Sequence, residues 1–395
     1  MRKPFRWFVL GIALAAAGSL VAQRPGGKGK GKGRPSFDEM IRLAIAEGFT
    51  GITAKGEVTP RLFKLAQTGV STAPVIDAAN AFLAALDADQ RKRASFATDD
   101  DEWRKWANQH SFKRDGIGFE ELSETQRLLA FSLLKNSLSA RGLQTTTDIM
   151  RLNGTLGELT GLTEEYNENL YWLSFMGEPS ATEPWGWQLD GHHAVINYFV
   201  LGDQVVMTPH FLGSEPIRAT SGAFKGAEIL QDEQTAALEF AMSLTDKQFA
   251  QANIGEKTGT NTVSEAFRDN ITLDYAGVRA ADLTAAQRQG LLDLAAHFIG
   301  QCRLPHAEVK MTEIREHLDS TYFGWIGSRD EDAVFYFRIH SPVVLIEFDH
   351  QRPIALERTG KPTRNHIHAV VRTPNGNDYG KDLLRQHHLH HHEKP

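Results

Sequence analysis

Two strand-like segments near the end of the chain carry candidate metal ligands at every second position. One segment carries two histidines and the other two carboxylates. His366 and His368 lie in the run 365–371, where the alternation of a β-strand would place both imidazoles on one face. Glu347 and Asp349 share a face of the preceding strand for the same reason. Two histidines and a carboxylate can bind a divalent transition metal, zinc above all, and leave one coordination position open for water. We therefore predict a metal site at His366, His368 and Asp349, with Glu347 as an assisting catalytic group.

Further histidines could assist such a site. His340 occupies a turn before a Ser-Pro pair, and His192 and His193 follow an Asp-Gly step that is typical of a tight turn. Because neighbouring strand residues face opposite ways, only one of His192 and His193 can join a given site. We assign His340 and His193 to the catalytic group. The alternative is that His366 and His368 are ordinary polar residues on a solvated sheet face.

Aromatic and basic side chains near these strands are candidates for ligand binding. Trp185 and Trp187 share one face of a predicted strand; core packing is the plain interpretation, whereas an exposed pair would form a platform for a saccharide or aromatic molecule. Arg338 could hold an anionic group by a bidentate contact. With His192 and His210, these residues form the candidate binding site for a small molecule or saccharide.

Several other chemistries are excluded by the sequence. It contains no Gly-x-Ser-x-Gly motif and no Gly-Lys-Ser/Thr phosphate loop, and its single cysteine, Cys302, can form no internal disulfide. Residues 1–35 hold eight of the 43 basic side chains and no acidic one. The rest of the chain therefore carries 35 basic against 49 acidic groups, a formal net charge of −14. An acidic body lacks the positive field that nucleic acid requires, so we expect no nucleic-acid partner.

The first 22 residues predict export. A cationic start at residues 1–6 precedes an uncharged apolar stretch at 7–22, which is the pattern of a secretory signal. The stretch is short for a membrane span, which needs about 20 apolar residues; an uncleaved signal anchor is the alternative. No later segment is long and apolar enough to span a bilayer. We predict a secreted or periplasmic protein with a flexible Gly/Lys-rich linker at 23–35.

The remaining chain predicts an α+β fold in which one unit occurs twice. Helical spacing of apolar residues comes first, and β-branched and aromatic runs separated by tight turns follow, which predicts helices and then an antiparallel β-meander. Strands beginning at Trp185 and Phe335 match at an offset of 150 positions, although a chance likeness of strand composition is the alternative. We predict units at 36–220 and 221–380 whose two sheets pack together. The His-rich tail at 381–395 would bind metal loosely.

Two groups of motifs stand out in the chain. The first comprises the runs 183–193, 208–209 and 213–216, and the second comprises 338–340, 347–349, 365–368, 377–380 and 382–387. These motifs resemble those of a known family, the bacterial and fungal domain of unknown function 3500. The similarity extends from about residue 48 to the C-terminus and implies no established activity.

These features favour an exported metal-dependent enzyme of the hydrolase type. The alternative is a non-catalytic ligand-binding or envelope-associated protein with an aromatic cleft between two sheets. Imidazoles that converge on one point would favour the enzyme, and imidazoles splayed on an open surface would favour the binding protein.

Overall fold

The strands of the protein join edge to edge in one large sheet. The computed structural model describes residues 35–256, 262–357 and 360–392, so the predicted signal segment lies outside the described residues. The strand order is β1-β3-β4-β5-β7-β12-β11-β10-β9-β8, with β2 on β3 and β6 on β5; β1 pairs in parallel and the other pairs are antiparallel. The strands are β1 (Ser95–Phe96), β2 (Ile117–Gly118), β3 (Tyr171–Met176), β4 (Trp185–Gly191), β5 (Ala194–Leu201), β6 (Gln204–Val206), β7 (His210–Ser214), β8 (Val278–Arg279), β9 (Tyr322–Ile326), β10 (Tyr336–His340), β11 (Leu345–His350) and β12 (Ile367–Arg372).

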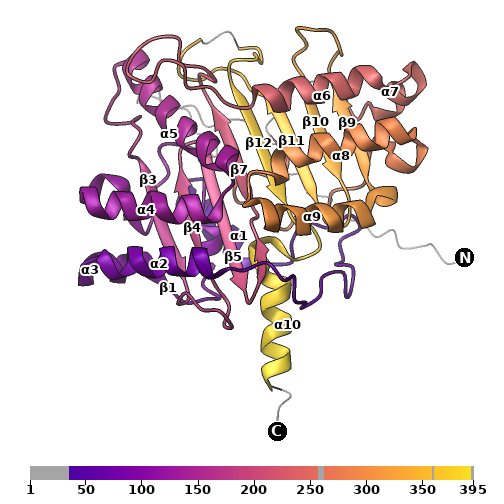
Figure 1. Ribbon diagram of the computed structural model, residues 1–395. Coiled ribbons are helices and arrows are strands. Elements are labelled where there is room, and N and C mark those ends of the chain that lie inside the picture. Colours follow the sequence, from indigo (N-terminus) through magenta and orange to yellow (C-terminus); the bar gives the residue numbers. More distant parts are fainter. Residues whose placement is uncertain (1–34, 257–261, 358–359, 393–395) are drawn as a thin grey trace, which may run out of the picture.

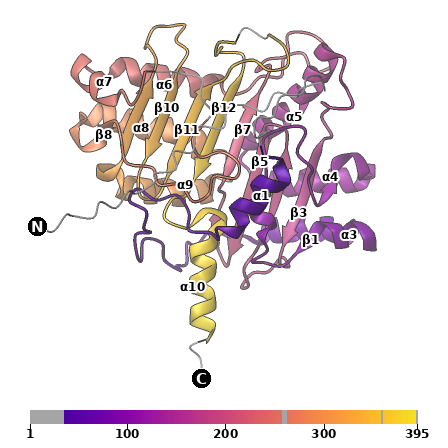
Figure 2. The ribbon, with the colours of Figure 1, turned by 180° about the vertical axis from the view of Figure 1, so that it is seen from behind.

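Helices cover one face of this sheet, and α1 with long connecting segments lies over the other (Figures 1 and 2). The last helix, α10, projects away from the body in both views. The α-helices are α1 (Phe37–Ala46), α2 (Ala73–Ala85), α3 (Ala88–Ala94), α4 (Glu124–Ser137), α5 (Ala140–Thr160), α6 (Gln231–Ser243), α7 (Asp246–Ala252), α8 (Ala285–Ile299), α9 (Leu304–Glu316) and α10 (Lys381–His392). Short 3-10 helices occur at Asp101–Arg104, Phe119–Glu121, Ala280–Asp282, Leu318–Ser320 and Asp378–Gly380. In the described part of the chain, no helix combines the length and apolarity needed to cross a membrane.

The same local interactions start corresponding helices in the two halves. Ser123 and Gln126 form a capping box at α4, and a threonine and Gln287 form one at α8, which satisfies the first free backbone N–H groups of each helix. The Gln126 amide then donates to Gln90 at 2.7 Å, and the Gln287 amide pairs with Gln248 at 3.0 Å. Helices, short strand and meander thus follow in the same order twice. A common origin of the halves remains a prediction.

The α+β class is confirmed, but the two meanders do not face each other. They join through antiparallel pairing of β7 with β12, from Ile367 opposite Ser214 to Val371 opposite His210. Each meander would otherwise end in an open strand edge with unpaired backbone N–H and C=O groups. Pairing β7 with β12 gives these groups hydrogen-bond partners. The expected pair of packed sheets is therefore one continuous sheet, with the seam between the halves at β7 and β12.

Candidate metal centre

A two-residue turn and the beginning of β12 bring three histidines together. His192 and His193 connect β4 to β5, where Gly191 pairs with Ala194. The turn is held from both sides: the Tyr171 hydroxyl donates to the His192 carbonyl at 2.9 Å, and the His193 N–H donates to the Asn108 carbonyl at 3.2 Å. His193 has φ +65°, a left-handed conformation that is uncommon outside glycine and that clusters at functional sites.

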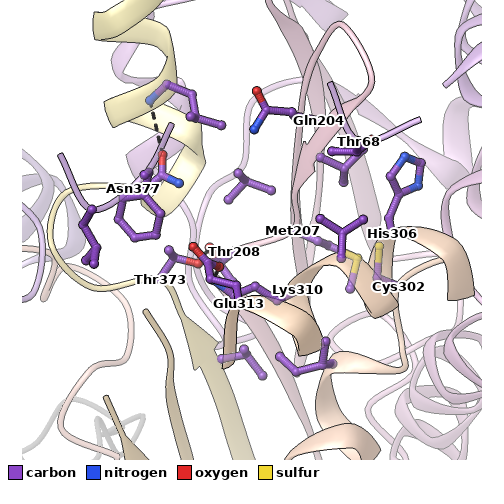
Figure 3. Close-up of a pocket in the computed structure, with 18 of the residues that line it drawn as sticks. Thr68, Gln204, Met207, Thr208, Cys302, His306, Lys310, Glu313, Thr373 and Asn377 are labelled. Atoms are coloured by element: carbon purple, nitrogen blue, oxygen red, sulfur yellow. Dashed lines mark hydrogen bonds and ion pairs between the residues drawn. The ribbon is translucent and has the colours of Figure 1, made fainter. Parts of the chain in front are cut away.

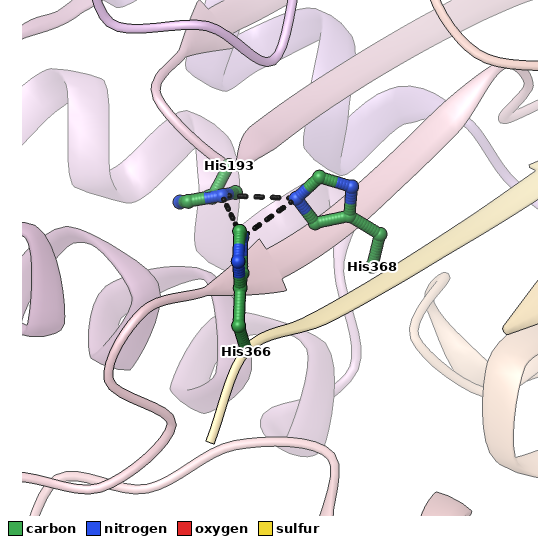
Figure 4. Close-up of side chains that lie close together, drawn as sticks. All are labelled: His193, His366 and His368. Carbon is green, nitrogen blue, oxygen red and sulfur yellow. Dashed lines mark hydrogen bonds between the residues drawn. The ribbon is translucent and has the colours of Figure 1, made fainter. Parts of the chain in front are cut away.

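His366 lies one residue before β12 and His368 lies within it. Their side chains are on one face, as the alternation predicts, and meet that of His193 (Figure 4). The three Nε2 atoms form a nearly equilateral triangle. His193 is 3.1 Å from His368 and 3.3 Å from His366, and His366 is 3.1 Å from His368. All three residues are buried. Within the described residues, no other group of three histidine, cysteine or carboxylate side chains converges in this way.

The protonation of His366 is fixed by the backbone. Its Nδ1 lies 2.8 Å from the Arg352 carbonyl oxygen, which can only accept, so Nδ1 carries the proton and Nε2 presents its lone pair to His193 and His368. Burial lowers the pKa of His366, and burial followed by the neighbouring imidazoles holds the pKa of His193 and of His368 well below the usual range. Neutral imidazoles can each present an Nε2 lone pair to one shared point, which is the arrangement that a metal ion requires.

A glycine permits this close approach. Gly213 in β7 lies opposite His368 across the seam. A Cβ at Gly213 would lie 3.0 Å from Cδ2 of His368 and 3.1 Å from Cδ2 of His193. Both imidazole rings therefore lie in the space that the Cβ of any other residue at position 213 would fill.

A second layer of side chains orients the triad. The His192 ring donates through Nδ1 to the Asn153 amide oxygen at 2.7 Å and stacks on the His193 ring with centroids 4.0 Å apart. The Glu215 carboxylate lies 3.6 Å from His366 Nδ1. Partners of this kind fix ring orientation and ligand basicity in metal sites. Beside the triad is a cavity of about 70 Å³ that His110 also lines.

The carboxylates predicted from the sequence lie on the expected face but are engaged elsewhere. Asp349 pairs with His368 in the strand register, yet its Oδ2 accepts from the Gln351 amide at 2.6 Å, and His193 takes the third place in the triad. Glu347 accepts the backbone N–H groups of residues 263 and 264 at 3.0 and 2.9 Å and the Tyr336 hydroxyl at 2.5 Å. It thus anchors the segment that crosses this face.

The other predicted residues are not gathered at the triad, apart from His192. His340 is buried against Tyr275, and Arg338 donates to the Asp274 carbonyl at 3.4 Å. His210 lines a different cavity, and burial lowers its pKa to about 4. Trp185 and Trp187 are fully buried, in agreement with the core interpretation, so they form no exposed platform.

Sequence reasoning missed three features of the site. His193 was predicted as a catalytic residue rather than as a metal ligand. Glu215 and His110 were not predicted as part of the site at all. The turn was predicted at the Asp-Gly step, but Asp190 and Gly191 end β4 and the two histidines themselves form the turn. The pair of adjacent histidines beside a turn motif was the available signal for His193. Nothing in the spacing marks Glu215, because its link to His366 depends on how the segment after β11 folds back.

Comparison with known proteins identifies one family. A family model described as a protein of unknown function (DUF3500) matches residues 68–381, which is most of the chain and confirms the resemblance carried by the motifs. No curated protein and no solved structure matches the chain.

Proposed function

We propose that this chain, which belongs to the DUF3500 family of proteins of unknown function, binds one divalent transition-metal ion at His193, His366 and His368 and uses it to activate water for hydrolysis of a small substrate. The observation that carries the proposal is the triangle of Nε2 atoms with 3.1–3.3 Å sides.

The triangle has the size that a shared ion requires. A point about 1 Å out of the plane of three such atoms is about 2.1 Å from each, which is the Zn–N distance of protein sites. The angles between ligands at that point are about 100°, so the donors occupy one side of the ion and leave the other side open. Three imidazoles suit zinc best among the common biological metals with this donor set.

The donors and the cavity favour activation of water. Neutral imidazoles leave the full charge on the ion, and an ion of this kind lowers the pKa of a bound water to about 7. The 70 Å³ cavity beside the triad limits the reacting group to a small one. The aromatic-cleft alternative has no comparable support, because Trp185 and Trp187 lie in the core. The signal segment adds the proposal that the protein works as a secreted or periplasmic enzyme.

Elemental analysis tests the metal site. The protein should be truncated before His387, because the histidine tail binds metal by itself. We expect about one zinc per truncated chain, and none after His193→Ala or the double change His366→Ala/His368→Ala. His317→Ala in the region after α9 is the matched control and should keep its metal. Equal metal content in all four proteins would refute the site.

A second measurement tests water activation. The zinc-loaded truncated protein should hydrolyse p-nitrophenyl acetate with a rate that rises through an apparent pKa near 7. Normal metal content without any rate above that of the His193→Ala variant would leave a metal site but refute the hydrolytic function.

A further inference from the structure

Figure 3 shows residues that line a second cavity, of about 500 Å³. This cavity shares no lining residue with the cavity beside the triad. It lies between α9, β6 and the segment 59–68, near the start of α10. Its size is in the range of small-molecule sites, which are about 300–1,000 Å³. The triad cavity, at about 70 Å³, is far smaller.

Most of the wall of this cavity is apolar. Side chains of the sheet, of α8 and of α10 contribute, and covering them with an apolar ligand is favourable because it removes apolar surface from water. The apolar wall includes Leu62, Phe63, Val206, Phe298, Val371 and Leu383.

The charged residues that line the cavity leave a positive balance. Lys310 and Glu313 neutralise each other at 2.6 Å. Arg61 and Lys64 are exposed and have no ion-pair partner among the described residues, and Glu316 is the remaining carboxylate. Burial lowers the pKa of both His210 and His306 to about 4, so neither adds charge at neutral pH. A positive rim is notable on a body whose formal charge is −14.

The segment that carries the two cations is held in place. The Gln204 side chain donates to the Lys64 carbonyl at 3.0 Å and accepts the Ala66 N–H at 2.9 Å. The Gln386 amide of α10 donates to the Phe63 carbonyl at 3.1 Å. Arg61 has φ +58°, a strained conformation for a residue with a side chain. These contacts fix the backbone of the segment, so only the side chains of Arg61 and Lys64 have to become ordered when a ligand binds.

We infer that this cavity binds one amphipathic anion, with its apolar body between α9 and β6 and its carboxylate or similar head group at Arg61 and Lys64. The inference does not depend on the metal site. We take the ligand to be a free molecule rather than a membrane lipid, and the vesicle comparison below distinguishes these two sources.

Decanoate, used below its micellar concentration, is a suitable probe for isothermal titration calorimetry. We expect one decanoate per chain, at least tenfold weaker binding in Arg61→Glu/Lys64→Glu, and none in Val206→Trp, which fills the cavity. Lys92→Glu/Lys135→Glu, on α3 and α4 outside the cavity lining, is the charge-matched control and should bind normally. The triad variants should also bind normally.

Two comparisons on the unaltered protein keep the test independent of variant folding. Decyltrimethylammonium has the same apolar chain and the opposite charge, and it should bind at least tenfold more weakly. Equal affinity for the two probes would overturn the role of the cations. Binding to anionic phospholipid vesicles without any binding of free decanoate would overturn the inference of a single-molecule site.

Discussion

Replacing Gly213 by alanine should damage the proposed metal centre while keeping all three candidate ligands, His193, His366 and His368. The added Cβ would lie 2.6 Å from the Ile367 carbonyl oxygen and 3.0 and 3.1 Å from the rings of His368 and His193. Ordinary contacts of a Cβ are 3.4–4 Å, so the rings must yield by several tenths of an ångström. Metal–ligand distances tolerate only about ±0.2 Å. We expect zinc binding to weaken 10- to 100-fold, or about 1.4–2.7 kcal/mol, as for changes in second-layer partners.

Competition with a chromophoric chelator measures this loss on the tail-truncated protein. Urea denaturation of the metal-free form measures the separate cost of overpacking, about 1–3 kcal/mol. Gly290→Ala is the matched control: it lies in α8, where the new Cβ would meet Phe240 at an ordinary 3.4 Å, and zinc affinity should not change. Unchanged zinc affinity in Gly213→Ala would refute the crowding argument, and so would an equal loss in both variants.

Three further changes probe the surroundings of the site and the core. Glu215→Gln removes a charge 3.6 Å from His366 Nδ1, and chelator competition should show about tenfold weaker zinc binding. Trp187→Ala should lower the free energy of unfolding by about 3–5 kcal/mol in urea while leaving zinc affinity unchanged, since the ring is a core side chain. His350 has its pKa lowered to about 3 by burial, so the unfolded state takes up its proton first. Its contribution to stability is complete above about pH 6.5 and is lost as the pH falls towards 3, at up to about 1.4 kcal/mol per pH unit; acid titration of His350→Gln should show a slope that is smaller by one proton.

The sequence predicts the elements of this fold better than their assembly. The capping residues Ser123 and Gln126 and the regular apolar spacing mark α4 in the chain itself, because capping is a local interaction. The joining of two meanders into one sheet depends on which edge strand meets which. The pairing of Ile367 with Ser214 spans more than 150 positions, and alternation along one strand contains no information about it.

The same limit explains the outcome at the site. Alternation is a local property, so it places His366 and His368 on one face correctly. Asp349 shares this face and lies opposite His368 in the strand register. Register does not decide which side chain reaches the Nε2 triangle, and the Asp349 carboxylate instead accepts a hydrogen bond from the amide of Gln351. His193 lies in the turn between β4 and β5, and its ring reaches past β7 to the two other histidines. Gly213 of β7 leaves the space that this ring needs.

The triad can form only when both halves of the molecule are in place. His193 belongs to the first meander and His366 and His368 to the second, so the Nε2 triangle exists only after β7 has paired with β12. A bound ion therefore stabilises the seam as well as its own ligands, by about 2.7 kcal/mol at a metal concentration 100 times the Kd. The corresponding turn of the second meander, between β10 and β11, carries His340 at its edge, and in the described part of the chain no second triad forms there. The halves thus share an order of elements but not the ligands, so the proposed chemistry occurs once, at the seam to which both halves contribute.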